Sequence, residues 1–223
     1  MNTLFVRLEG PLQAWGERAR WTIRDTASEP TKSGVVGLLA CALGLRRDQE
    51  SELASLSGQL KMGVRCDRDG VILRDYHTVV GGAMSAEGKI KVNATTREPE
   101  TVVSQRYYLA DASFLVALQS DPVTVSRLKE AILDPVWPPF LGRRSCPPSM
   151  PFYAGTGIYD GLDAALTQGP GVDALAGLLV RLVVEGASGA AVRRRDEVIS
   201  LRVRRYGYRY VEERLVRLPG GAS

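Results

Sequence analysis

Histidine and cysteine are scarce in this sequence. Its 223 residues include one histidine, His77, and three cysteines at positions 41, 66 and 146, none of which belongs to a CxxC pair. Zinc sites need several such ligands at close spacing, so a thiolate or imidazole zinc site cannot be assembled here. A metal site built from carboxylates alone stays open, although no motif indicates one. We therefore expect no metal and no other cofactor.

Long apolar segments are also lacking. The longest apolar run, residues 35–45, is interrupted by Gly37 and Gly44 and is too short to span a bilayer. Residues 1–8 do not contain a basic segment followed by an apolar core, as a secretory signal peptide would. These features predict a cytoplasmic protein with no membrane contact. The length suits one large domain or a domain with a smaller lobe.

Lysine is rare, whereas arginine is abundant. Of the 29 basic residues only five are lysine, so 29 − 5 = 24 are arginine. Residues 181–217 hold ten arginines and five acids, a net charge of +5, which leaves the rest of the chain at 4 − 5 = −1. Guanidinium groups suit bidentate phosphate contacts and stacking on bases. A basic terminal segment favours a polyanionic partner, although a GC-rich genome or a solvated strand face would explain the same composition.

Apolar periodicity predicts a β-α-β unit, an irregular excursion and a second β-α-β unit. The first unit is predicted to contain a strand at residues 4–8, an extended loop at 12–29, a helix from about 34 to 43, a helix at 49–56 and a strand at 60–66. A tight turn at 68–70 joins that strand to a strand at 71–74 as a hairpin, and a protruding hairpin or mobile arm follows at 79–105. The second unit is predicted to contain a strand at 112–118, a helix at 121–133 and a short strand near Val136.

This order is the α+β, ferredoxin-like plan βαββαβ, in which two helices cover one face of a sheet. The other sheet face is then free, and in RRM-like domains that face binds RNA. After residue 151 the chain becomes rich in glycine, and strands are expected at residues 178–185, 198–205 and 208–218. We interpret residues 151–223 as a smaller β-rich C-terminal lobe.

The sharpest local motif is the loop at residues 142–148, directly after the second β-α-β unit. Gly142 allows close approach of the backbone to a ligand, and Arg143, Arg144 and Ser145 offer donors to phosphate and base oxygens. Two prolines follow and hold the loop open. The loop is therefore a candidate RNA contact, the alternative being an arginine pair on a solvated turn.

Two further motifs are candidates for RNA binding. Lys32, Ser33 and Gly34 stand at a helix start, where free N–H groups favour phosphate, although simple capping explains the same residues. This segment is not a Walker A loop, because Thr replaces glycine at positions 26 and 31. Gln13 and Trp15 precede several arginines, a mixture that suits splayed single-stranded bases, although Trp15 also suits the core.

His77 is the one residue that suggests acid–base catalysis. With the adjacent Tyr76 and with Lys32 it could in principle cleave RNA. Neighbours along a strand point to opposite faces, however, and a lone histidine is more often a structural or contact residue. No G-x-S-x-G elbow indicates serine hydrolase chemistry.

Several of these segments stand in the order that they have in one known family. They are residues 10–16, 30–34, 73–79, 111–114 and 140–147. Together they resemble the CasD family, the subunits of the type I-E CRISPR Cascade complex that hold the 5′ handle of the guide RNA. The resemblance runs from about residue 4 to residue 152, and the remainder shows no family motif.

The resemblance implies an RRM-like domain over residues 1–150 with an inserted hairpin thumb at about 79–108, and a separate C-terminal lobe over 151–223. It implies a subunit of an antiviral ribonucleoprotein that caps the 5′ handle of the crRNA without catalysis, with Arg106 contacting RNA near the handle–spacer junction. Implied partners are the crRNA, the Cascade backbone subunits, the large PAM-reading subunit and, through the complex, target DNA. Related type I-C subunits cut guide RNA, so a metal-independent endoribonuclease acting on CRISPR repeat RNA is the alternative.

Overall fold

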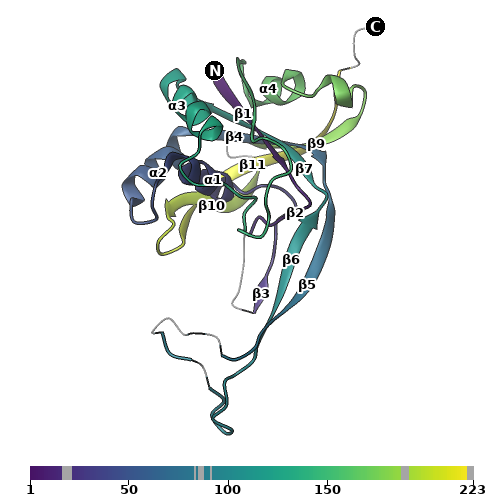
Figure 1. Cartoon of the computed structure of the whole chain (residues 1–223). Coiled ribbons are helices and arrows are strands. Elements are labelled where there is room, and N and C mark those ends of the chain that lie inside the picture. Colours follow the sequence, from purple (N-terminus) through teal and green to yellow (C-terminus); the bar gives the residue numbers. More distant parts are fainter. Residues whose placement is uncertain (17–21, 83, 85–87, 91, 187–190, 220–223) are drawn as a thin grey trace.

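A central sheet of seven strands organises the chain. The computed structural model describes every residue except 17–21, 83, 85–87, 91, 187–190 and 220–223. The strands lie in the order β10-β11-β9-β4-β7-β1-β8 (Figure 1). Their bounds are β1 Asn2–Glu9, β4 Lys61–Arg68, β7 Ser113–Ser120, β8 Tyr153–Ile158, β9 Leu179–Glu185, β10 Val192–Ser200 and β11 Arg205–Arg217.

Four of these strands follow the predicted βαββαβ order. β4, β7, β1 and β8 are neighbours, and each adjacent pair is antiparallel. The connection from β1 to β4 carries two helices, α1 (Lys32–Leu43) and α2 (Glu50–Gln59), and the connection from β7 to β8 carries α3 (Pro122–Leu133). The α+β class predicted from the sequence is therefore the observed class.

The strand predicted near Val136 is wrong. The residues around it form no strand in the described chain, and β8 fills the sheet edge next to β1. Pro135, Pro138 and Pro139 have no N–H to donate to a strand ladder, which explains the difference. Val136 instead donates its N–H to the carbonyl of Ala42 in the last turn of α1, at 2.9 Å.

The helix boundaries follow local chemistry that is readable in the sequence. The Thr31 hydroxyl accepts from the N–H of Gly34 and caps α1, which ends at Gly44 with φ of 73°. Asp121 caps α3 by accepting from the N–H groups of Val123 and Thr124, and Pro122 occupies the first turn. None of the helices in the described part of the chain combines the length and apolar character needed to cross a membrane.

The strands after residue 150 share the main sheet. β9 pairs with β4, β11 pairs with β9, and β10 pairs with β11 at the far edge. On its inner side β10 packs against α1 and α2. The division of the chain at residue 150 stays a prediction, but the C-terminal strands do not form a sheet of their own.

The two faces of the main sheet are both covered at the centre. On one face the three long helices pack on side chains such as Leu4 and Leu8. On the other face Phe5 packs in a second apolar cluster with Leu166 of α4 (Leu162–Gln168), which is followed by the short 3-10 helix η1. The prediction that this second face would be free is wrong for the strands beneath α4.

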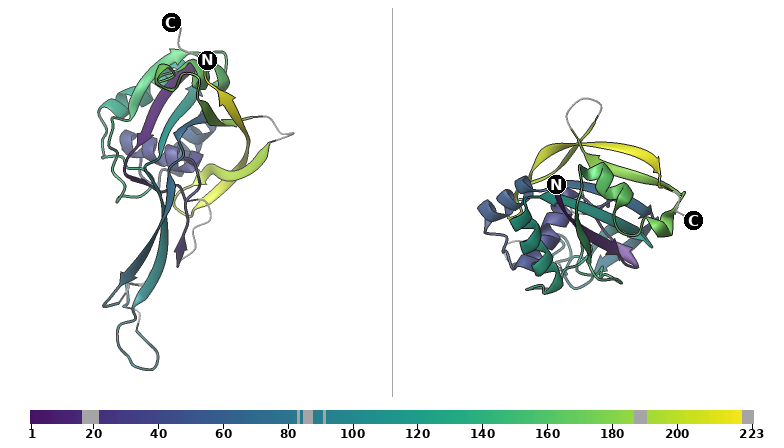
Figure 2. Two further views of the ribbon diagram at one scale, coloured as in Figure 1. Left: turned by 90° about the vertical axis from the view of Figure 1, so that its right-hand side faces the viewer. Right: turned by 90° about the horizontal axis from the view of Figure 1, so that it is seen from above.

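A second, smaller sheet forms the projection seen at the bottom of Figure 1 and in the left view of Figure 2. β5 (Val71–Val79) pairs with β6 (Val102–Ala110) over its whole length. The predicted pairing of residues 60–66 with 71–74 is wrong, because β4 pairs with β7 and β9. Along its other edge β6 binds β2 (Leu12–Gln13) and β3 (Ile23–Arg24), within the stretch predicted as a loop.

Candidate nucleic-acid interface

A cleft opens beside the first turns of α1. It consists of two adjoining hollows of about 370 and 270 Å³. Three segments distant in the sequence meet there: the start of α1, the loop that follows α3, and the turn between β10 and β11. Both hollows are lined by Ser33, Gly34, Gly142, Arg204 and Tyr206.

The loop that follows α3 has a fixed shape, which positions Arg143. The N–H of Leu141 bonds to the carbonyl of Cys146 at 2.9 Å, and the N–H of Cys146 bonds to the carbonyl of Arg143 at 2.8 Å. Gly142 has φ of 82°, and a Cβ added there would lie 1.8 Å from the carbonyl oxygen of Ala14. Only glycine fits this position, because both the left-handed backbone and the close approach exclude a side chain.

Arg143 is held partly inside the protein with one nitrogen unpaired. Its guanidinium carbon lies 4.7 Å from the centre of the Tyr108 ring, and its Nη2 donates to the carbonyls of Arg24 (2.9 Å) and Asp25 (3.3 Å). Its Nη1 is buried and has no hydrogen-bond partner among the residues that the structure describes, and the same is true of Nε of Arg106. Buried donors without a partner are rare and costly in proteins, so an acceptor from outside the chain is the natural explanation.

Four arginines from four segments lie close together, of which three line the smaller hollow and the fourth, Arg106, lies beside Arg24. Arg24 lies on β3 opposite Arg106 of β6, and Arg143 and Arg204 come from the loop and the turn. Burial, and then the positive charges of these three arginines, lower the pKa of Arg24. None of the four forms an ion pair within the described chain. A cluster of cations that lowers its own pKa is stabilised by a bound polyanion.

Arg204 stands in a backbone conformation that arginine rarely adopts. Its φ is 53°, in the left-handed region, at the last residue of the turn between β10 and β11. Such strain costs about 1–2 kcal/mol and is concentrated at functional sites. Here the strained residue places a cationic side chain at the cleft.

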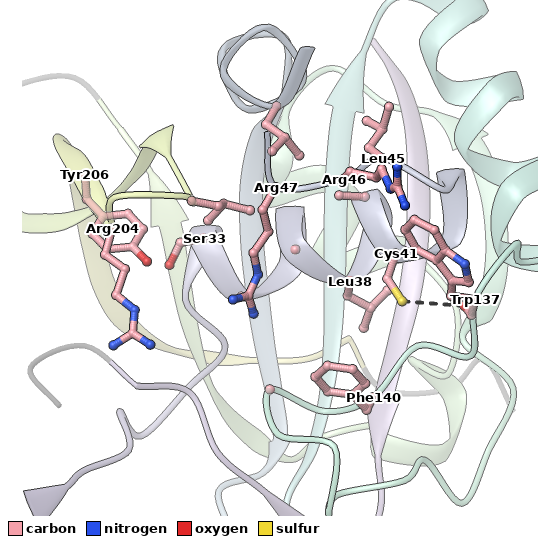
Figure 3. Close-up of a pocket in the computed structure, with 16 residues that line it drawn as sticks. Ser33, Leu38, Cys41, Leu45, Arg46, Arg47, Trp137, Phe140, Arg204 and Tyr206 are labelled. Carbon is pink, nitrogen blue, oxygen red and sulfur yellow. Dashed lines mark hydrogen bonds between the residues drawn. The ribbon is translucent and has the colours of Figure 1, made fainter. Parts of the chain in front are cut away.

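The larger hollow adds flat side chains to the cations. Trp137, Phe140 and Tyr206 line it together with Arg46, Arg47 and Arg204. Figure 3 shows Arg47 and Arg204 extending their guanidinium groups toward the same side of the hollow. Aromatic rings and guanidinium planes stack on splayed bases, while the same guanidinium groups bind phosphate oxygens.

Two predicted RNA contacts, Gln13 and Trp15, are corrected by the structure. Gln13 is fully buried: its amide donates to the carbonyls of Leu8 (3.0 Å) and Ala112 (2.8 Å), and its oxygen accepts from Trp15 Nε1 (3.0 Å). Trp15 is 1% exposed and packs against Gly34. Trp15 forms part of the floor of the smaller hollow, and the polar groups of both side chains are paired within the protein.

Lys32 is the third correction. It is 2% exposed, and its ammonium nitrogen lies 2.7 Å from Glu197 and 3.3 Å from Glu185. Its backbone N–H bonds to Asp196 Oδ2 at 2.8 Å, so a carboxylate of the chain occupies the helix start where phosphate was predicted. Ser33 and Gly34 still line the cleft.

Three other predicted RNA contacts do not line the cleft. Arg144 and Ser145 are exposed on the same loop as Arg143 but do not line either hollow. His77 is half-buried on β5 opposite Ser104, further along the hairpin than Arg106 and outside the cleft. Within the described residues no three histidine, cysteine, aspartate or glutamate side chains are grouped so as to hold a metal ion.

Sequence reasoning did not name Arg46, Arg47, Trp137, Arg204 or Tyr206 as site residues, although all five line the cleft. Arg24 lies in the arginine-rich stretch after Trp15, and Arg204 lies in the basic segment 181–217, so composition indicated both regions. Which arginine of each region reaches the cleft depends on the pairing of β3 with β6 and of β10 with β11.

Known proteins are similar to this chain in sequence and in fold. Residues 3–212 match the model of a family described as CRISPR-associated protein (Cas_Cas5). The chain is 43% identical over 164 residues to the CRISPR system Cascade subunit CasD of Escherichia coli (strain K12), covering 69% of this chain and 70% of that protein.

Two solved structures are similar over nearly the whole chain. A chain of a CRISPR RNA-guided surveillance complex has a TM-score of 0.78 and 30% identity, with coverage of 97% of this chain and 91% of that one. A crystal structure of a Cas protein has a TM-score of 0.70 and 35% identity, with coverage of 98% of each chain.

Proposed function

The chain belongs to the CRISPR-associated protein (Cas_Cas5) family, and on this premise we propose that it is a Cascade subunit that binds guide RNA. In detail, the proposal is a type I-E subunit that caps the 5′ handle of the crRNA and does no chemistry. The β5–β6 hairpin stands at the handle–spacer junction, with Arg106 at its base. In such an assembly base pairing selects the target while the protein holds RNA shape and backbone.

The cluster of Arg24, Arg106, Arg143 and Arg204 carries this proposal. Burial and then its like charges lower the pKa of Arg24, and two of its nitrogens are buried without a hydrogen-bond partner among the described residues. Phosphates of a bent RNA strand satisfy both needs, because each supplies negative charge and several acceptor oxygens. The aromatic wall of the larger hollow supplies surfaces for the bases of that strand.

The proposal extends to partners. The guide RNA handle, the Cascade backbone subunits and the large PAM-reading subunit are the expected neighbours, and target DNA is reached through the complex. Support comes from the similarity to a Cascade subunit and to a chain of an RNA-guided surveillance complex.

Removal of two cleft cations tests the function. Arg143→Ala combined with Arg204→Ala should weaken binding of a labelled handle RNA by about tenfold or more, since a good contact is worth roughly 1–3 kcal/mol. The slope of log affinity against log salt should also become shallower by about 0.7 for each phosphate that the protein no longer neutralises. Both quantities follow from fluorescence anisotropy at several salt concentrations.

Arg127→Ala is the matched control. It removes an exposed arginine on α3 that does not line the cleft. Equal effects of Arg127→Ala and the double variant, or no effect of the double variant, would contradict the assignment of RNA binding to the cleft.

The alternative endoribonuclease needs Lys32, Tyr76 and His77 together. The ammonium group of Lys32 is held by Glu185 and Glu197 beneath the C-terminal strands, and Tyr76 and His77 are strand neighbours. We expect repeat RNA to stay intact when incubated with the chain and EDTA. Cleavage that is lost in His77→Ala would establish the enzyme instead.

A further inference from the structure

The sheet face opposite the long helices is open at one end. α4 covers this face over β4, β7 and β9, and its Asp163 pairs with Arg214 of β11. Beyond that point the outer face of the β10–β11 ribbon has no covering element in the described chain, and Tyr208 and Tyr210 are 55% and 38% exposed there. Exposed aromatic side chains that adjoin on one strand face form a contiguous patch, and such patches mark interaction sites.

The open face combines the two tyrosines with arginines. Arg193 pairs with Tyr210 across the ribbon, so the two side chains lie on the same face. The guanidinium carbon of Arg193 lies 4.2 Å from the centre of the Tyr208 ring. Arg195, at the irregularity in the pairing, is exposed, and its Nε lies 3.5 Å from the carbonyl oxygen of Tyr206. Neither arginine forms an ion pair with a described carboxylate.

The ribbon is rigid because its inner face is anchored. Asp196 accepts two hydrogen bonds from Arg209, at 2.7 and 2.9 Å, and Glu197 binds both Lys32 of α1 and Ser57 of α2. A platform whose backbone is fixed from below loses little conformational entropy when a ligand binds above it.

The ribbon also continues the cleft. Arg204 and Tyr206 line the hollows, and Tyr208 follows only two residues further along β11. A strand that leaves the cleft past Tyr206 therefore reaches Tyr208, and with it the Tyr208–Arg193 pair, within about 7 Å.

We propose that the outer face of the β10–β11 ribbon is a second site, which binds single-stranded nucleic acid. Bases stack on Tyr208, Tyr210 and the Arg193 guanidinium, and phosphates contact Arg193 and Arg195. Aromatic platforms beside unpaired cations are the recurring design for sequence-tolerant single-strand binding. The site is separate from the handle-binding cleft, and its charge favours a polyanion over a protein surface.

The test compares ribbon variants with cleft variants on different probes. Tyr208→Ala with Tyr210→Ala should bind a labelled oligo(U) of about 20 nucleotides at least about tenfold more weakly than the parent chain, because one base–aromatic stack accounts for such a factor. Tyr208→Phe with Tyr210→Phe keeps both rings and should bind like the parent. Arg193→Ala with Arg195→Ala should weaken binding and make its salt dependence shallower.

Controls separate this site from the cleft. Arg127→Ala removes an exposed arginine on α3 and should change nothing. A short labelled handle RNA should bind the ribbon variants like the parent but bind the Arg143→Ala, Arg204→Ala chain weakly. If the Arg143→Ala, Arg204→Ala chain binds the handle RNA like the parent, the handle proposal fails, and the ribbon proposal is unaffected.

One result would overturn the ribbon site, namely parental binding of oligo(U) by both the tyrosine-to-alanine and the arginine-to-alanine chains. If these chains also fail to assemble with other Cascade subunits, the face is a protein interface. A circular dichroism melt that matches the parent shows that a weak variant is folded. The arginine-to-alanine chain keeps the test valid if the tyrosine-to-alanine chain unfolds.

Discussion

Two groups of cations lie near the start of α1, and they are built in opposite ways. Beneath the C-terminal strands, Lys32 and Arg209 are buried beside Glu185, Asp196 and Glu197. At the cleft, four arginines lie close together without an ion pair in the described chain, and burial together with their positive charges lowers the pKa of Arg24. Neutralised cations hold the fold together, whereas cations that lack carboxylates are available to a ligand.

The strongest test of this contrast removes a carboxylate. Asp196→Ala strips Arg209 of both short contacts and frees the N–H of Lys32. A buried charge without its partner costs about 3–5 kcal/mol, so urea denaturation should show a loss of that size. Glu212→Ala, on the exposed side of β11, should cost less than about 0.5 kcal/mol. Equal losses would mean that the buried network contributes no more than a surface pair.

A second test concerns the loop that presents Arg143. Gly142→Ala places a Cβ against the carbonyl of Ala14 and forces the loop to move. Handle RNA should bind about tenfold or more weakly, because misplacing Arg143 also removes its stack on Tyr108. Gly58→Ala in α2 has open space around its Cβ and should raise the free energy of unfolding by about 0.5–1 kcal/mol with unchanged RNA binding. Parental RNA affinity in the Gly142 variant would contradict the assignment.

A substitution at Lys32 should change the unfolding free energy without changing the RNA affinity. Lys32→Met leaves Glu185 and Glu197 without their ammonium partner, and these side chains are 21% and 23% exposed. We expect a loss of about 1–3 kcal/mol in unfolding free energy, less than for a fully buried pair. RNA affinity, measured well below the melting temperature, should stay at the parental value. A fall in affinity as large as that of Arg143→Ala would return Lys32 to the binding site.

The smallest expected effect has opposite signs in two assays. Arg204→Gly relieves the left-handed backbone strain at φ of 53°, so unfolding free energy should rise by up to about 1 kcal/mol. The same change removes a cleft cation and should weaken RNA binding by several-fold. Arg204→Asn, which tolerates this backbone, should also weaken binding. Lower stability together with normal binding would show that Arg204 is structural.

Much of the fold is readable from short-range patterns. Thr31 and Asp121 indicate helix starts, and Gly44 indicates a helix end. Residues 114–118 form a continuous apolar run at the centre of the buried strand β7. These features depend on neighbours within a few residues, which the sequence shows directly.

Long-range pairing was not readable in the same way. The turn at residues 68–70 suggested a hairpin. Instead, β4 and β5 lie in different sheets, because the two edges of β4 pair with β7 and β9 and β5 pairs with β6. Lys32 looked like a phosphate ligand because the three carboxylates that enclose it lie more than 150 residues away. Arg143 was predicted because Gly142 marks a close backbone approach, which is a local signal.

The projecting β5–β6 hairpin exposes apolar side chains and an open strand edge when the chain is on its own. Nine residues of each strand pair over about 30 Å, and Val71, Ile72, Leu73 and Tyr76 are 47–71% exposed along it. The outer edge of β5 has unpaired backbone groups in the described chain. An apolar strand with an open edge promotes aggregation, so production of this chain in a soluble state should improve when its neighbours are synthesised beside it.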